Sequence, residues 1–116
     1  MKDFKELGVW QKAHRFALDV YRATKDFPGE ERFGLTSQLR RAAVSAPANI
    51  AEGCGRSGDR ELGRFLGMAA GSASEAEYHL LLARHLGYLS PETHAQLDTQ
   101  VNEVKRMLNS FITKLR

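Results

Sequence analysis

Residues 59–86, DRELGRFLGMAAGSASEAEYHLLLARHL, carry the longest helical pattern in this sequence. Their apolar side chains recur every three or four positions, at Leu62, Phe65, Leu66, Ala69, Ala70, Ala73, Ala76, Leu80, Ala83 and Leu86. This spacing places them in one broad band along an α-helix, and such a band is buried against other elements. Gly87 follows directly and predicts the end of the helix, because glycine readily adopts the left-handed conformation found there.

Another helix is predicted immediately downstream. Ser90 is suited to cap it, Pro91 fits the first helical position, and Glu92 favours the positive end of the helix dipole. The apolar residues that follow alternate spacings of four and three, at Leu97, Val101, Val104, Leu108, Phe111 and Leu115. This heptad-like spacing is typical of a helix that packs along other helices, and it continues almost to Arg116.

Two more helices are predicted upstream. The stretch from Leu35 to Gly53 has a stripe of mostly small residues, at Leu35, Leu39, Ala42, Ala43, Ala46 and Ile50. Pro47 removes a backbone donor from this stretch, so we expect a kink there. An apolar face also runs through residues 9–27, which Pro28-Gly29 should terminate; its members are Val9, Trp10, Ala13, Phe16, Ala17, Val20 and Tyr21.

The chain is long enough for one domain but not for two, so residues 1–116 are predicted to form a single domain. No run of residues alternates between apolar and polar as a strand does. The breaks between the four helical segments are short, and short connections make consecutive helices antiparallel neighbours. The predicted fold is therefore all-α, an antiparallel up-down-up-down four-helix bundle.

Composition restricts the location and the chemistry of the protein. The formal net charge is +3, which permits a polyanionic partner without requiring one. The single cysteine, Cys54, cannot form an internal disulfide, and a free thiol suits the cytosol. The sequence starts without an apolar signal-peptide core and has no stretch of about 20 apolar residues. We therefore expect a cytoplasmic protein without a membrane segment.

No catalytic, metal or cofactor site is predicted. The four histidines are scattered, at His14, His79, His85 and His94, and none belongs to a His-Glu-x-x-His motif. Cys54 lies among glycines and has no activating neighbour in the sequence, which a catalytic thiol would need. We therefore expect a protein that is not an enzyme and that requires no metal ion or cofactor.

Arginines are the charges most relevant to a nucleic-acid partner. The candidate nucleic-acid-binding residues are Arg40, Arg41, Arg56, Arg60 and Arg64. The last three lie within about two helical turns of one another, so their side chains could form a stripe. With Arg32, such a stripe could bind phosphates.

Two alternatives for these arginines stay open. Acidic residues are interleaved with them and could pair with them instead, namely Glu30, Glu31, Glu52, Asp59 and Glu61. Arg40 and Arg41 could also reach Glu75 or Glu77 across the bundle. In either case the arginines would be structural or solubilising, and no phosphate site would result.

Five positions are predicted to serve packing and assembly. Gly63, Gly67 and Gly71 recur at intervals of four on the predicted third helix. An exposed glycine inside a helix costs about 1 kcal/mol relative to alanine, so three in register suggest a groove where another backbone comes close. Asn49 and Glu52 lie next to small residues, and they could form a polar network within the bundle or between subunits that sets the packing register.

Several blocks of the sequence resemble one known family. They are VWQKA (9–13), FP (27–28), GLTSQLRRAA (34–43), PANIAEG (47–53), FL (65–66), GSASEAE (71–77) and LGY (86–88). Over nearly the whole chain they are similar to the bacterial four-helix bundle proteins named for 23S rRNA intervening sequences. The resemblance implies a homopentameric ring and offers no agreed catalytic residues. A related branch, the accessory variability determinant of diversity-generating retroelements, is a pentamer that binds nucleic acid and associates with a reverse transcriptase.

Two functional hypotheses result. The first is a non-enzymatic homo-oligomer, a pentamer by resemblance, that binds structured RNA or other nucleic acid through a basic surface. Repetition of that surface around a ring would raise its avidity. The alternative is a protein-interaction scaffold or accessory subunit without nucleic-acid contact. Salt separates the two, because phosphate binding weakens steeply with ionic strength whereas apolar docking does not.

Overall fold

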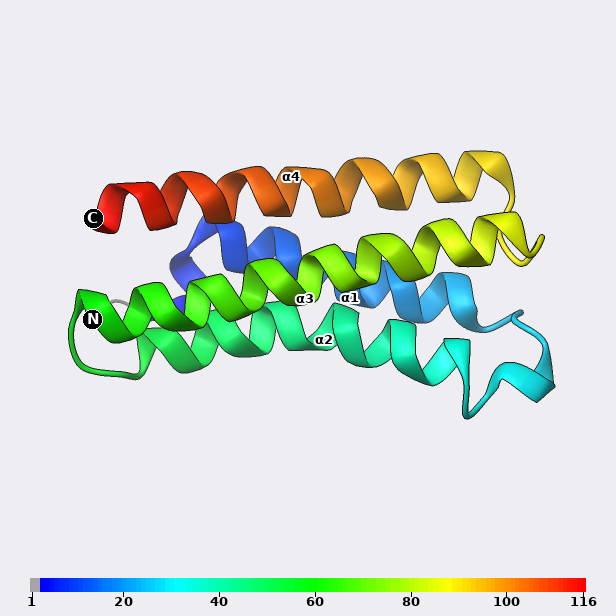
Figure 1. Cartoon of the computed structure of the whole chain (residues 1–116), viewed down its shortest axis with the longest axis horizontal. Coiled ribbons are helices and arrows are strands. Elements are labelled where there is room, and N and C mark those ends of the chain that lie inside the picture. The colour runs from blue at the N-terminus through cyan, green and yellow to red at the C-terminus, as the bar shows by residue number, and fades with distance from the viewer. Residues whose placement is uncertain (1–2) are drawn as a thin grey trace.

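The computed structural model describes residues 3–116, so Met1 and Lys2 of the predicted domain lie outside the described residues. Its elements are η1 (Phe4–Glu6), α1 (Gly8–Thr24), η2 (Gly29–Glu31), α2 (Leu35–Cys54), α3 (Asp59–His85) and α4 (Pro91–Leu115), where η denotes a short 3-10 helix. Figure 1 shows the four α-helices lying alongside one another. The described residues contain no strand, and the all-α class is confirmed.

The helix ends agree with the sequence signals except in α1. The Ser90 hydroxyl accepts a hydrogen bond from the Thr93 amide at 3.1 Å, and Pro91 is the first residue of α4. Gly87 has a φ of +81°, a conformation that favours glycine, just after α3 ends. α1 was predicted to reach Phe27 but ends at Thr24. The boundary was predicted from Pro28-Gly29, but the helix stops three residues before Phe27, which is buried beyond the helix end.

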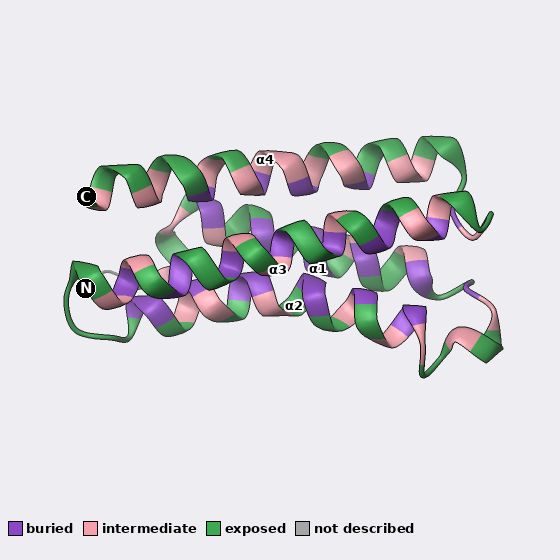
Figure 2. Ribbon diagram, viewed as in Figure 1, coloured by how far each residue is buried: buried purple, intermediate pink, exposed green. Residues whose placement is uncertain are grey.

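Side chains from all four α-helices form one hydrophobic cluster. Figure 2 shows that buried positions alternate with exposed ones along each helix, as amphipathic helices require. The largest fully buried side chains are Phe16, Leu39, Ile50, Leu66, Leu80, Leu108, Val20, Val101 and Val104. Tyr21 was predicted on the apolar face of α1, but 43% of it is exposed. Its ring instead packs against a guanidinium on α2, as described below.

The contact between α2 and α3 depends on small residues. Alanines are frequent among the buried residues of these two helices, at Ala42, Ala43, Ala46, Ala69, Ala73 and Ala76. A Cβ atom added to Gly53 would lie 2.9 Å from Phe65 Cβ, so this glycine allows α2 and α3 to approach closely. α2 runs without interruption through Pro47, so the proline does not end the helix.

Polar contacts also tie the helices together. Lys105 on α4 donates to Glu77 on α3 at 2.7 Å, and Gln100 on α4 donates to Asp19 on α1 at 2.8 Å. The Ser72 hydroxyl donates to the Ser45 hydroxyl at 2.9 Å and so joins α3 to α2. These bonds connect elements far apart in the sequence and help to fix their relative positions.

The helices do not have the composition of membrane spans. Within residues 3–116, none of them combines the length and the apolar character needed to cross a bilayer.

Candidate nucleic-acid interface

The structure divides the five candidate arginines into two groups. Arg56, Arg60 and Arg64 lie at the loop between α2 and α3, whereas Arg40 and Arg41 lie in the first half of α2. Helical rise between residues 40 and 54 alone is about 21 Å. Figure 1 shows the loop at one end of the molecule and the start of α2 at the other. One protomer therefore does not present the five arginines as a single stripe.

Two of the three arginines near the loop are paired with carboxylates. Arg56 binds Glu52 at 2.8 Å and Arg64 binds Glu61 at 3.0 Å, and the hydrogen bond from Arg64 lowers the pKa of Glu61. Both guanidinium groups also lie over the Phe65 ring, 5.2 Å and 4.6 Å from its centroid. The pairing that competed with phosphate binding in the sequence therefore occurs here. Such exposed pairs are weak, so phosphate could still replace the carboxylates.

The other group lines a cleft of about 370 Å³ at the start of α2. We call it the Arg40 cleft, and its lining residues are Tyr21, Arg32, Phe33, Thr36, Ser37, Arg40 and Arg41. The helix repeat explains the grouping, because residues 36 and 40, like residues 37 and 41, are four apart and so share a face of α2. Residues 32 and 33 immediately precede the helix, and Tyr21 comes from α1.

Arg40 is held in the cleft by α1. Its Nε donates to Thr24 Oγ1 at 2.7 Å, and one of its terminal nitrogens donates to the Tyr21 carbonyl at 3.4 Å. Its guanidinium also lies 4.6 Å from the centroid of the Tyr21 ring. The alternative that Arg40 and Arg41 reach Glu75 or Glu77 is therefore wrong, since neither arginine forms an ion pair within residues 3–116 and Glu77 binds Lys105.

The Arg40 cleft keeps its positive charge. In residues 3–116, no carboxylate lies within 4 Å of the charged nitrogens of Arg32, Arg40 or Arg41. The nearby Glu31 carboxylate is engaged elsewhere, accepting from the Leu35 amide at 3.1 Å and from the Tyr88 hydroxyl at 2.9 Å. Three guanidinium groups thus gather without the neutralisation seen near the loop.

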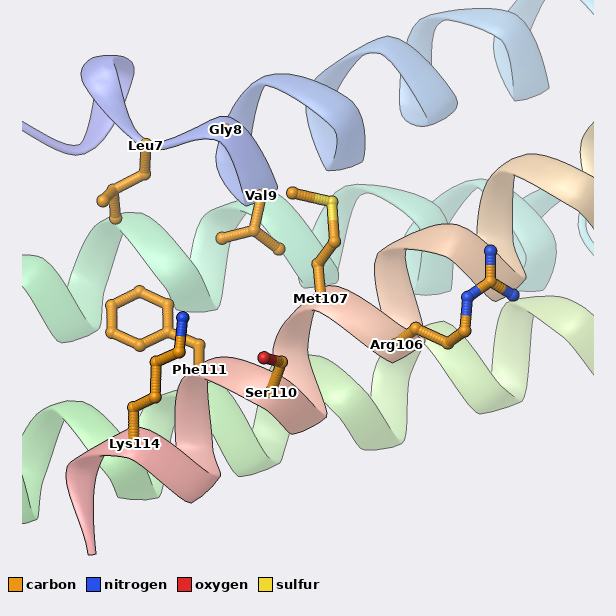
Figure 3. A pocket seen from close by; sticks show the side chains of 8 residues that line it. All are labelled: Leu7, Gly8, Val9, Arg106, Met107, Ser110, Phe111 and Lys114. Carbon is orange, nitrogen blue, oxygen red and sulfur yellow. The ribbon is translucent and has the colours of Figure 1, made fainter.

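A second cleft, of about 490 Å³, lies between the start of α1 and the C-terminal half of α4. Figure 3 shows its walls of apolar side chains, with Arg106 and Lys114 at its edges. The sequence did not predict it, because the residues that line it come from opposite ends of the chain and share no local pattern.

The predicted assembly positions lie partly on the surface. A Cβ atom added to Gly67 or Gly71 would meet no atom within 4 Å, so neither glycine serves a close contact within the described chain. A Cβ atom at Gly63 would lie at an ordinary 3.9 Å from Leu115. No backbone of the described chain therefore makes the predicted close approach at Gly67 or Gly71, and an approach by another subunit stays a prediction.

Asn49 belongs to a polar network within the bundle, because the Ser45 hydroxyl that it contacts also accepts from Ser72 on α3, whereas Glu52 does not join this network in the described residues. Asn49 donates to the Ser45 carbonyl and hydroxyl on its own helix, at 2.9 Å and 3.0 Å. Glu52 is exposed and binds only Arg56 in the described residues. A role between subunits stays a prediction.

Groups that often carry chemistry are isolated in this structure. Cys54 is buried, and burial raises the pKa of its thiol, which disfavours the reactive thiolate. His79 is buried as well, and its nearest carboxylate is the exposed one of Glu75, at 3.9 Å. Within residues 3–116, no three His, Cys, Asp or Glu side chains are grouped so as to hold a metal ion.

The fold and its charged clefts define a small all-α protein built of four helices. The sequence model of the 23S rRNA-intervening sequence proteins matches residues 5–110, so the chain belongs to this family. A crystal structure of a protein of unknown function from the S23 ribosomal protein family of Bacteroides thetaiotaomicron is similar, with a TM-score of 0.84 and 26% sequence identity. The similarity covers 90% of this chain and 97% of that one. No curated protein matches the sequence.

Proposed function

We propose that this protein is a non-enzymatic, homo-oligomeric nucleic-acid-binding protein that recognises structured RNA. The observation that carries the proposal is the gathering of Arg32, Arg40 and Arg41 around one cleft without a carboxylate partner. Unpaired guanidinium groups on a protein of positive net charge attract phosphates, and their planar forks match phosphate oxygens. The arginines near the loop form a second, weaker contact region, because two of them must first leave their carboxylates.

The proposal includes self-association. We propose that the four helices of each protomer run up-down-up-down. We also propose that the protomers assemble into the homopentameric ring that the family resemblance implies. Support comes from α3, where Gly67 and Gly71 leave open space on a surface that also exposes Met68 by 46% and Tyr78 by 58%. Exposed apolar side chains beside glycines suit the close approach of another helix. Each added protomer would repeat the Arg40 cleft and multiply weak phosphate contacts.

Binding across a salt series tests the nucleic-acid role. The purified protein would be titrated with a structured RNA and with a duplex DNA, and compared with the variants R40E/R41E and R56E/R60E/R64E. We expect affinity that falls steeply with salt, that R40E/R41E abolishes, and that R56E/R60E/R64E weakens less. Absence of binding at low salt would contradict the proposal. If only R56E/R60E/R64E lost nucleic-acid binding, the binding site would lie at the loop between α2 and α3 instead.

A protein-interaction scaffold remains the second candidate. Exposed apolar side chains favour it, among them Val44, Met68, Tyr78, Leu81 and Leu86, each at least 41% exposed. Under this alternative the arginines keep the protein soluble, and partner binding would change little between low and high salt. The salt series therefore separates the two candidates.

A further inference from the structure

We propose that the Arg40 cleft binds one unpaired nucleotide of a single-stranded nucleic acid segment, with the base stacked on Phe33 and the phosphate bound by Arg40 and Arg41. The inference rests on the proposed function and deepens it, because it names the feature of the nucleic acid that this protein recognises.

Phe33 supplies the stacking surface. It is 86% exposed, the largest exposed fraction among the large apolar residues of the described chain. It lies between η2 and α2, and the Arg32 guanidinium is 5.2 Å from the centroid of its ring. An aromatic ring left in solvent beside a guanidinium is the combination that stacks unpaired bases, and every base offers a flat face to it.

Arg40 and Arg41 supply the phosphate contact. Contacts with Thr24 and Tyr21 hold the Arg40 side chain in place, so phosphate binding would cost it little conformational freedom. Arg41 follows it on the same wall and is exposed. Neither arginine has to leave a carboxylate of the described chain before it binds a phosphate.

The wall of the cleft offers further polar groups. Ser37 lines it with a hydroxyl-bearing side chain. Thr36 also lines it, and its buried hydroxyl oxygen has no hydrogen-bond partner among the described residues. A buried polar group without a partner is uncommon in folded proteins and is often satisfied by a ligand or a water molecule. The volume of about 370 Å³ lies within the usual range for sites that hold a small ligand.

This arrangement discriminates against paired bases. Bases within a duplex are stacked on their neighbours, so Phe33 cannot reach their faces, whereas nucleotides in loops and single strands can splay out. Phosphates are available in both forms. We therefore infer that the arginines provide general affinity and that Phe33 provides a preference for unpaired nucleotides.

The test uses a short RNA strand without self-complementarity, free and annealed to its complement, together with the DNA strand of the same sequence. One base is replaced by the fluorescent analogue 2-aminopurine, whose emission falls on stacking. F33A should weaken single-strand binding by about fivefold to a hundredfold and leave duplex binding unchanged. F33Y should retain the affinity and the quenching. L86A, which truncates another exposed apolar side chain (50%), is the matched control and should behave as the native protein.

Three outcomes would overturn the inference. Equal binding of free and annealed strands, unaffected by F33A, would contradict the stacking role while leaving the proposed function in place. A change of oligomeric size in F33A without a change in affinity would assign Phe33 to a contact between subunits. No binding of any strand at low salt would overturn both the inference and the proposed function. A comparison of the RNA and DNA strands shows which nucleic acid the cleft prefers.

Discussion

Gly53 lies at a close approach of α2 and α3. No space is left for a side chain at this position, since an added Cβ would lie 2.9 Å from Phe65 Cβ and 3.2 Å from Leu62 Cδ1. The nearer atom, Phe65 Cβ, is bonded directly to the backbone and cannot move unless the backbone of α3 moves with it. Neither helix could keep its position around a larger residue.

G53A should therefore destabilise the protein. The cost of overpacking, about 1–3 kcal/mol, exceeds the gain of about 1 kcal/mol that alanine brings to a helix. Denaturant unfolding at fixed protein concentration measures the difference. G63A is the matched control and should be neutral or stabilising, because its added Cβ would meet only Leu115 at 3.9 Å. Equal stability of G53A and the native protein would contradict this account of the contact.

Glu77 makes stability depend on pH. The hydrogen bond from Lys105 lowers the pKa of Glu77 from its ordinary value of 4.5, outweighing the effect of burial. The ionised form is thus favoured by folding, so the stabilisation is complete above about pH 4.5 and disappears as the pH falls through the lower folded value. E77Q should cost up to about 1 kcal/mol at neutral pH, because the pair is partly exposed.

The measurement is the difference in unfolding free energy between the native protein and E77Q from pH 7 to pH 3. It should shrink as the solution becomes more acidic. E30Q is the control, because Glu30 is exposed and forms no ion pair within the described chain. A difference in unfolding free energy that grew toward low pH would contradict stabilisation by the Lys105–Glu77 ion pair.

Glu31 connects three elements at one end of the molecule. It lies at the end of η2, accepts from the amide of Leu35 at the start of α2, and accepts from the hydroxyl of Tyr88 in the turn after α3. An acidic side chain at this position also suits the positive end of the α2 dipole. Phe33 and the rest of the Arg40 cleft lie directly beside it.

E31A should loosen the start of α2. Loss of a hydrogen bond from an amide to a carboxylate costs about 1.5–3 kcal/mol, and here the bond from Tyr88 is lost as well. Thermal unfolding measures the effect, and amide hydrogen exchange should show faster exchange for residues 35–38. E30A is the control, since the carboxylate of Glu30, next to Glu31 in the sequence, is exposed and makes no hydrogen bond among the described residues. Unchanged exchange in E31A would show that the hydrogen bond to Glu31 does not hold the start of α2.

Periodic patterns predicted the elements well because burial follows them. Apolar spacing placed all four helices, and the start of α4 was predicted from its cap, its proline and its acidic residue. The end of α1 was misplaced because Pro28-Gly29 only sets a limit to the helix, which stops earlier, at Thr24. The short helices η1 and η2 were both missed, since three residues carry no periodicity.

The candidate site could be predicted only in part. All five arginines were identified from charge, but sequence distance alone does not say that α2 separates them into two groups. Burial patterns likewise gave no sign that Tyr21, on α1, would meet Arg40. Phe33 was not singled out, although an aromatic residue between an arginine and a glycine, outside the apolar stripes, was a usable signal. The grouping of the arginines and the meeting of Tyr21 with Arg40 depend on contacts between different elements, which local sequence patterns do not reveal.

Assembly of the whole molecule can be tested at Gly67. Within the described chain its position is open, so the monomer fold should tolerate a leucine there. G67L should therefore keep its helical content by circular dichroism and lose its oligomeric mass by light scattering, if α3 faces another subunit as proposed. A native mass for G67L would contradict the predicted interface. Loss of helical content would show that the glycine is needed within the chain itself.

The most direct test of the central claim, that unpaired arginines of the Arg40 cleft bind nucleic acid, is the slope of log affinity against log salt concentration for a structured RNA. Each phosphate contact removed should reduce that slope by about one. We predict a steep slope for the native protein, a slope smaller by about two in R40Q/R41Q, and a smaller reduction in R56Q/R64Q, whose arginines are already paired. A slope near zero for the native protein, or one unchanged in R40Q/R41Q, would contradict the account.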